Sequence, residues 1–167
     1  MRITINTVVL SISDKVAAGE AIDKSGPVLI EELMKLPSNV HIVATEVLAG
    51  DLSSIAERLL FYADRGDVHL IATTGGTGLG PRDHTPEATQ SVLQREVPGF
   101  AEAMRFSSYD KTPLAPLSRA VCGVRGGTLI INFPGSVRGV RENFDSIRKA
   151  LPHAIGTLSG QTGKCAS

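Results

Sequence analysis

The sequence predicts an α/β fold of three layers, in which a mostly parallel sheet with one antiparallel hairpin strand carries helices on both faces. Three observations lead to this fold class. Apolar, β-branched runs alternate with amphipathic helical segments, the order that gives parallel strands joined by helices. These runs are continuously apolar, which is typical of strands covered on both faces. The short turn 125–127 separates two such runs and indicates the hairpin.

The first half of the chain is expected to form alternating strands and helices. Strands are predicted at residues 7–12, 40–48 and 68–73. Ser25 is expected to cap a helix whose first turn contains Pro27, and the break at 37–39 ends that helix. Asp51 begins a second helix, with apolar residues spaced along one face.

The second half continues the pattern. Helices are predicted at residues 86–95, 99–109 and 137–151, and strands at 120–124 and 128–132. The segment 113–117 is expected to be extended, and Pro152 to interrupt the last helix. The chain is therefore expected to form one domain, 1–158, followed by a flexible tail, 159–167.

Composition narrows the class of protein. The 167 residues are 42% hydrophobic and 20% charged, which is typical of a globular domain. Lys plus Arg equals Asp plus Glu at 17 each, so no basic field favours nucleic acid. We find no membrane-spanning run or secretory segment and expect no membrane partner. Cys122 and Cys165 lie far apart, which predicts neither zinc nor a disulfide and favours the cytoplasm.

Residues 68–85 contain the most informative motif, a strand followed by a glycine-rich loop and a helix start. Its glycines are expected to turn tightly, adopt positive φ and let a ligand approach: Gly75, Gly76, Gly78 and Gly80. A helix N-terminus offers free N–H groups, so the loop favours an anion. The motif lacks the Gly-Lys of a phosphate-binding P-loop and the glycine spacing of a dinucleotide fingerprint.

Polar loops are predicted at the carboxyl ends of four strands, where ligands bind in open α/β sheets. These loops are residues 13–25, 49–51, 75–83 and 132–136. We expect them to converge on one edge of the sheet and to form a site there.

Several residues in these loops allow two interpretations. Asp51 could cap a helix or take part in chemistry. Asp83, beside Arg82, suits a divalent cation. Ser118 has no nearby base in the sequence, which favours hydrogen bonding over a nucleophilic role. Asp14 and Asp23 could be turn residues or functional ones, and four arginines could meet a polyanion or be surface charges: Arg82, Arg119, Arg125 and Arg138.

An ordered set of motifs from about Val8 to about Leu158 resembles the molybdopterin adenylyltransferase family, which includes the gephyrin G domain and its plant counterpart. The motifs are Ser11-Ile12-Ser13-Asp14, Asp23-Lys24-Ser25-Gly26-Pro27, Thr74-Gly75-Gly76-Thr77-Gly78, Pro81-Arg82-Asp83, Thr85-Pro86-Glu87-Ala88-Thr89, Pro98-Gly99, Leu117-Ser118-Arg119 and Asn132-Phe133-Pro134-Gly135. His84 and Ser136 depart from the usual pattern. The resemblance implies that residues 1–158 form a single molybdopterin-binding domain.

The resemblance implies a reaction in which molybdopterin and Mg-ATP give adenylyl-molybdopterin and pyrophosphate. It makes Asp51 and Asp83 the catalytic and Mg²⁺-binding residues. It places the bound substrates at Gly75, Gly76, Thr77, Gly78, Arg82, Ser118, Pro134 and Gly135. It further implies a homotrimer or hexamer, and the molybdenum-insertion enzyme as a candidate partner. A homologue that binds molybdopterin or a nucleotide without turnover is the alternative, and a scaffold protein a third interpretation.

Overall fold

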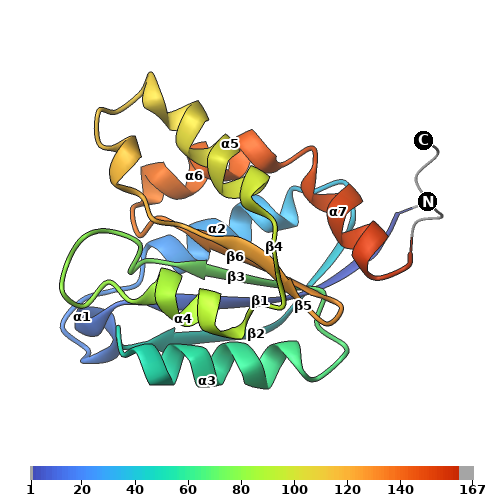
Figure 1. Cartoon of the computed structure of the whole chain (residues 1–167), viewed down its shortest axis with the longest axis horizontal. Coiled ribbons are helices and arrows are strands. Elements are labelled where there is room, and N and C mark those ends of the chain that lie inside the picture. Colours follow the sequence, from blue (N-terminus) through green and yellow to red (C-terminus); the bar gives the residue numbers. More distant parts are fainter. Residues whose placement is uncertain (1, 162–167) are drawn as a thin grey trace.

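A six-stranded sheet runs through the middle of the molecule (Figure 1). The computed structural model describes residues 2–161. Its strands are β1 (Thr4–Ile12), β2 (Asn39–Leu48), β3 (Leu70–Thr74), β4 (Arg95–Glu96), β5 (Cys122–Arg125) and β6 (Thr128–Phe133). Its helices are α1 (Asp14–Ala17), α2 (Ser25–Met34), α3 (Leu52–Ala63), α4 (Thr85–Val92), α5 (Pro98–Tyr109), α6 (Val137–Ile147) and α7 (Leu151–Leu158), with one 3-10 turn, η1 (Ala115–Leu117).

The strand order is β2-β1-β3-β6-β5-β4. Strand β1 pairs in parallel with β2 and β3, and β3 pairs in parallel with β6. Strand β5 is antiparallel to both of its neighbours, β6 and β4. The predicted fold class is confirmed, including the hairpin strand that runs against the others.

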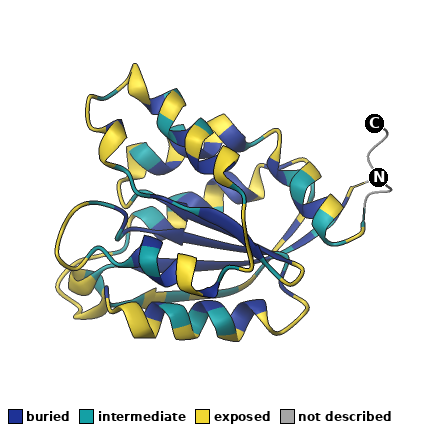
Figure 2. Ribbon diagram, in the orientation of Figure 1, coloured by how far each residue is buried: buried dark blue, intermediate teal, exposed yellow. Residues whose placement is uncertain are grey.

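Helices cover both faces of the sheet (Figure 1). On one face α2, α5, α6 and α7 pack over a core that includes Leu29, Met104 and Phe144. On the other face α3 and α4 contribute Ile55 and Ala88. Figure 2 shows the buried strands between these two layers. Because both faces are covered there, β1, β3 and β6 are buried along nearly their whole length, as their apolar runs predict, whereas the edge strand β2 alternates between exposed and partly buried residues.

A buried polar cluster ties the centre of the sheet together. Asn132 on β6 is fully buried, and its Nδ2 donates to Thr73 Oγ1 at 3.0 Å and Thr89 Oγ1 at 2.9 Å. Its Oδ1 accepts from Val121 N at 3.1 Å. The side chain thus links β3, α4 and the start of the hairpin, and its amide atoms are engaged inside the protein.

Asn132→Ala is expected to lower the free energy of unfolding by about 1–3 kcal/mol, because it leaves a buried amide and two hydroxyls without their partner. Urea unfolding measures this loss. Ser53→Ala, which removes an exposed hydroxyl on α3, serves as the control. Equal unfolding midpoints for Asn132→Ala and the wild type would show that the cluster contributes nothing.

The predicted helix 86–95 is wrong at its end, since α4 stops at Val92. Gln94 N donates to Val124 O at 2.9 Å and Val97 N to Cys122 O at 2.8 Å, so the segment between them pairs with β5 as β4. Pairing with a distant strand overrides the local helical pattern.

The predicted helix 137–151 is two helices. Helix α6 ends at Ile147 and α7 begins at Leu151, with Pro152 in its first turn. A proline suits this position because the first N–H groups of a helix have no intrahelical partner. Pro152 therefore starts a helix where it was expected to interrupt one. Similarly, the segment 113–117 contains η1 and is not extended.

The two described ends of the chain lie side by side. The Gln161 side chain accepts from Thr4 N at 2.8 Å and donates to Thr4 O at 2.9 Å. The remainder of the predicted tail, 162–167, lies outside the described residues. Within residues 2–161, no helix has the length and apolar character needed to cross a bilayer.

Candidate functional site

The four predicted loops converge at the carboxyl ends of β1, β2, β3 and β6. Gly75 N donates to Phe133 O at 3.1 Å, and Thr74 Oγ1 donates to Pro134 O at 2.8 Å. Between the loops that follow β1 and β2, Gly50 N donates to Asp14 Oδ1 at 2.8 Å. The helices that follow these parallel strands begin at the same edge, so several helix N-termini face the site, an arrangement that favours anions.

The start of the glycine loop requires glycine. Gly75 has a φ of +96° and Gly76 a φ of +65°. A Cβ on Gly75 would collide with the carbonyl oxygen of Ile12, and one on Gly76 would collide with Thr85 Oγ1. Thr85 Oγ1 in turn donates to Gly75 O at 2.8 Å. These two glycines therefore hold the loop against β1 and the first turn of α4.

The prediction of positive φ is wrong for Gly78 and Gly80. These glycines instead make room for the carboxylate of Asp83, since a Cβ on either would lie 2.8–2.9 Å from Asp83 Oδ2. Gly80 N donates to the same oxygen at 2.8 Å. The loop thus wraps around Asp83, which is fixed by backbone contacts.

Arg119 holds this loop in place. Its Nε donates to Gly78 O at 2.7 Å and its Nη2 to Asp83 O at 2.6 Å, while Nη1 pairs with Glu87. All three guanidinium nitrogens have partners in the protein, which corrects the idea that Arg119 meets a polyanion. Arg125 is also engaged, in an ion pair with Asp64 near the hairpin turn at the amino end of β6.

Asp51 caps α3, as one of its two interpretations predicts. Its Oδ2 accepts from Ser54 N at 2.9 Å and from Ser54 Oγ at 2.8 Å. These hydrogen bonds, the backbone one first, lower the pKa of Asp51, and the positive charge of Arg82 lowers the pKa further. The carboxylate is exposed and ionised at neutral pH. A catalytic role for Asp51 stays a prediction.

Arg82 forms a forked ion pair with Asp14. Arg82 Nε and Nη2 donate to the two oxygens of Asp14, each at 3.0 Å. These bonds, together with the N–H of Gly50, lower the pKa of Asp14 to about 2. The backbones also meet here, because a Cβ on Gly50 would lie 2.5 Å from Arg82 O. The segments that carry Asp51 and Asp83 are therefore neighbours.

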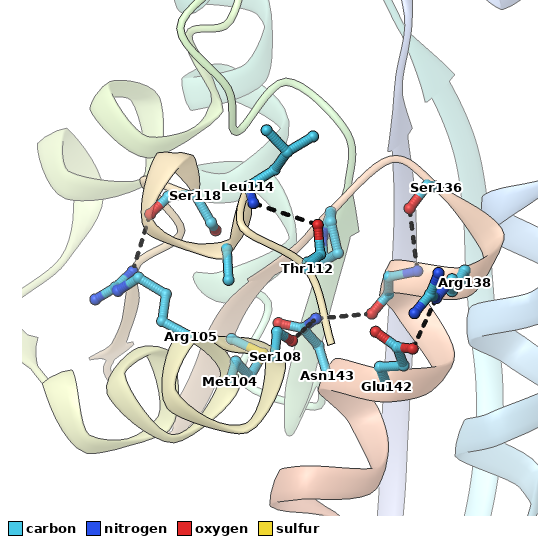
Figure 3. Close-up of a pocket in the computed structure, with 13 residues that line it drawn as sticks. Met104, Arg105, Ser108, Thr112, Leu114, Ser118, Ser136, Arg138, Glu142 and Asn143 are labelled. Carbon is cyan, nitrogen blue, oxygen red and sulfur yellow. Dashed lines mark hydrogen bonds and ion pairs between the residues drawn. The ribbon is translucent and has the colours of Figure 1, made fainter. Parts of the chain in front are cut away.

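A cavity of about 260 Å³ opens on one side of the Pro134–Gly135 loop (Figure 3). It is lined by residues of α5, η1, α6 and the loops beside them, among them Met104, Arg105, Ser108, Thr112, Leu114, Ser118, Pro134, Arg138 and Asn143. Asn143 Nδ2 donates to Ser108 Oγ at 3.2 Å, and Arg138 pairs with Glu142. We call this cavity the helical cavity. It combines apolar walls with hydrogen-bonding groups and cationic side chains.

A second cavity of about 370 Å³ also borders that loop, at Gly135. It is lined by the backbone of Gly75, Gly76 and Gly135 and by side chains that include Lys15 and Lys24. We call it the glycine-loop cavity. The predicted binding residues are thus divided, with Ser118 and Pro134 in the helical cavity and Gly75, Gly76 and Gly135 in this one. Thr77 is buried, and Gly78, Asp51, Arg82 and Asp83 line neither cavity.

The carboxylates of Asp51 and Asp83 fit a metal site that is completed by a bound substrate. No group of three or more His, Cys, Asp or Glu side chains within residues 2–161 is placed to hold a metal by itself. Mg²⁺, however, is commonly bound by one or two carboxylates together with substrate phosphates and waters. Asp51 and Asp83 suit an ion held jointly with a bound polyphosphate.

Comparison with known protein families shows the family to which this chain belongs. A family described as a probable molybdopterin binding domain matches residues 8–153. The chain belongs to this family. Among curated relatives, the molybdopterin adenylyltransferase of Helicobacter pylori is 38% identical over 157 residues, which are 94% of this chain and 89% of that protein.

Other members of the molybdopterin-binding family differ in length. Gephyrin from Dictyostelium discoideum is 38% identical over 160 residues, 92% of this chain, but the chain spans only 22% of that protein. The crystal structure of the molybdopterin biosynthesis enzyme MoaB from Thermus thermophilus superposes with a TM-score of 0.87 and 45% identity. That match covers 93% of this chain and 97% of the other.

In this member of the molybdopterin-binding family, sequence reasoning missed most of the helical cavity. Met104, Arg105 and Ser108 on α5 and Asn143 on α6 were predicted only as helix residues. Their helical spacing predicts that they face the protein interior, but it does not predict that a cavity remains beside α5 and α6. Ser118, Pro134 and Arg138 are the predicted site residues that line it.

Proposed function

We propose that this chain is a molybdopterin adenylyltransferase of molybdenum cofactor biosynthesis. A terminal phosphate oxygen of molybdopterin attacks the α-phosphorus of ATP, a new P–O bond forms, and the bond to the leaving pyrophosphate breaks. The observations that carry this proposal are the pair of cavities that both border Pro134–Gly135 and the neighbouring loops of Asp51 and Asp83 at the same edge of the sheet. The name and similarity of the Helicobacter pylori relative support it.

The helical cavity suits the pterin. Met104 and Leu114 supply apolar surface for a planar ring, and Ser108, Thr112 and Asn143 supply hydrogen-bonding groups. Pockets for small ligands commonly combine apolar walls with a few placed polar groups. Arg105 and Arg138 bring positive charge for the pterin's anionic groups.

The glycine-loop cavity suits the phosphates of ATP. Backbone at Gly75 and Gly76 can approach a ligand closely because no side chain intervenes. Lys15 and Lys24 contribute positive charge there. Bringing two polyanions together needs such charge, and holding both in one geometry lowers the entropy cost of their reaction.

Asp51 and Asp83 would hold Mg²⁺ jointly with the nucleotide phosphates. The metal, when bound, supplies positive charge that stabilises the developing charge at the α-phosphorus and on pyrophosphate. The protein's own part is to fix the two carboxylates, through Ser54 and the backbone of Gly80, and to place Arg82 beside them. No nucleophilic side chain is required, because the attacking oxygen belongs to the substrate.

Incubation of the purified protein with molybdopterin, ATP and Mg²⁺ tests the proposal. Adenylyl-molybdopterin and pyrophosphate are the expected products, separated by liquid chromatography. If molybdopterin binds but neither product forms, the chain is a binding homologue and the proposed reaction is wrong.

We also propose that the protein forms a homotrimer or hexamer in the cytoplasm. Phe106 is 85% exposed, and Tyr109 and Leu114 are each 65% exposed, so α5 and the following loop leave apolar surface in the single chain. Such surface commonly marks an interface. Light scattering measures the assembly, and a monomeric mass would contradict it.

The molybdenum-insertion enzyme is a candidate recipient of the product, adenylyl-molybdopterin.

Asp51→Ser is expected to reduce adenylyl transfer by about a hundredfold with little change in melting temperature. Serine caps a helix about as well as aspartate, so the bond to the Ser54 amide can be replaced. The negative charge cannot be replaced, and loss of one preorganised electrostatic group commonly costs about 10²–10³ in rate. Product formation and thermal melting are measured on the same preparation. Full activity would leave Asp51 with capping as its role.

A further inference from the structure

Asp14 is placed where three loops of the site meet. It lies in the first turn of α1, directly after β1, and α1 is anchored because Ser13 N donates to Leu48 O at 2.9 Å at the end of β2. From this position the Asp14 carboxylate reaches two other loops. It accepts from Gly50 N at 2.8 Å and from both Nε and Nη2 of Arg82 at 3.0 Å.

Each group that Asp14 holds is the chain neighbour of a carboxylate of the proposed reaction. Gly50 precedes Asp51, and Arg82 precedes Asp83. The two oxygens of one side chain thus connect the loop of Asp51 to the loop of Asp83. A forked pair between arginine and carboxylate fixes direction as well as distance, since two parallel hydrogen bonds define the plane of the guanidinium.

We propose that Asp14 is a positioning residue, which sets the separation of Asp51 and Asp83 so that both contact one Mg²⁺ ion. This inference rests on the proposed function. Asp14 itself does not touch the metal or the reacting phosphates. It acts through the amide of Gly50 and the guanidinium of Arg82, which its negative charge keeps turned toward α1.

Stabilisation of the fold is a different role and would have a different signature. The Asp14 and Arg82 side chains are 44% and 55% exposed, and exposed ion pairs contribute little to folding. Loss of the pair is therefore expected to leave the melting temperature nearly unchanged. Geometry at a metal site is more sensitive, because a displacement of about 1 Å in a positioned group can cost 10²-fold in rate.

The test compares Asp14→Asn with Asp67→Asn. Asp67 forms the same kind of exposed forked pair, with Arg65 at 3.0 and 2.8 Å, but just before β3, at the opposite end of the sheet. Asp14→Asn is expected to raise the Mg²⁺ concentration for half-maximal adenylyl transfer about tenfold, with the KM for molybdopterin nearly unchanged. Asp67→Asn is expected to match the wild type. An unchanged Mg²⁺ requirement in an active Asp14→Asn protein would overturn the proposal.

Amide hydrogen exchange separates this inference from the proposed function, because it needs no activity. In Asp14→Asn, the peptides that cover residues 49–51 and 80–84 are expected to exchange several-fold faster, while the peptides of α7 do not change. Exchange equal to that of the wild type in both loops would overturn the positioning role, whether or not the protein is active. If the wild type makes no adenylyl-molybdopterin, the proposed function fails, and a proposal that rests on it fails in its catalytic part.

Discussion

Asp83→Asn is expected to lower the rate of adenylyl transfer by about a hundredfold or more. The reason is charge, because the substitution keeps the size and shape of the side chain. Asp83 Oδ2 accepts from Gly80 N at 2.8 Å, and the amide oxygen of asparagine can accept the same bond. The loop is therefore expected to keep its conformation while the metal loses a negative ligand. Loss of one electrostatic group of this kind commonly costs about 10²–10³ in rate.

The measurement is single-turnover formation of adenylyl-molybdopterin over a series of Mg²⁺ concentrations. Asp64→Asn is the matched control, since Asp64 is an exposed acid paired with Arg125 near the amino end of the sheet, away from the site. The control is expected to keep wild-type turnover. If Asp83→Asn reaches the wild-type rate at saturating Mg²⁺, the metal assignment is wrong.

Gly76→Val is expected to abolish binding of both molybdopterin and ATP. A valine there would need a φ of +65°, which β-branched residues rarely adopt, and its Cβ would collide with Thr85 Oγ1. Thr85 starts α4 and donates to Gly75 O, so relief of the clash must move the loop and the helix start together. Both ligands are affected, because Gly75 and Gly76 line the glycine-loop cavity and Gly75 N is bonded to Phe133 O, next to Pro134 in the wall of the helical cavity.

A second glycine separates strain from the site. Gly66 also has positive φ, +81°, but a Cβ there would meet no atom within 4 Å. Gly66→Val is therefore expected to lower the melting temperature and to leave both affinities unchanged. Titration calorimetry with each ligand makes the comparison. Wild-type affinity in Gly76→Val would show that the glycine loop serves only as a connection.

The fold was largely predictable because its sheet follows local rules. The alternation of apolar runs and helical segments specifies parallel strands, and the Gly126–Gly127 turn specifies the hairpin. One error occurs where a distant partner decides, since the two residues of β4 are strand only because β5 lies beside them. The error at Pro152 is local, because a proline that would interrupt a helix interior is accommodated in the first turn of α7.

The site was predictable in outline for a related reason. Parallel strands bring their carboxyl ends to one edge, so the loops of Asp51 and Asp83 could be placed together without coordinates. The partners of single side chains could not. Arg119 was a candidate for a polyanion, yet it binds carbonyl oxygens of the glycine loop, whose positions no sequence pattern specifies. Asp14 allowed two interpretations until its contacts with Gly50 and Arg82 were visible.

The position of β6 in the sheet has a consequence for synthesis of the chain. This strand, the last one within residues 2–161, inserts beside β3 in the interior of the sheet, and the loop after it forms a wall of both cavities. A nascent chain must therefore emerge from the ribosome beyond Gly135 before either cavity can exist. Early folding units built from β1, β2 and β3 cannot be captured by ligand. A ligand that binds in these cavities therefore stabilises the completed domain and adds no stability to its folding intermediates.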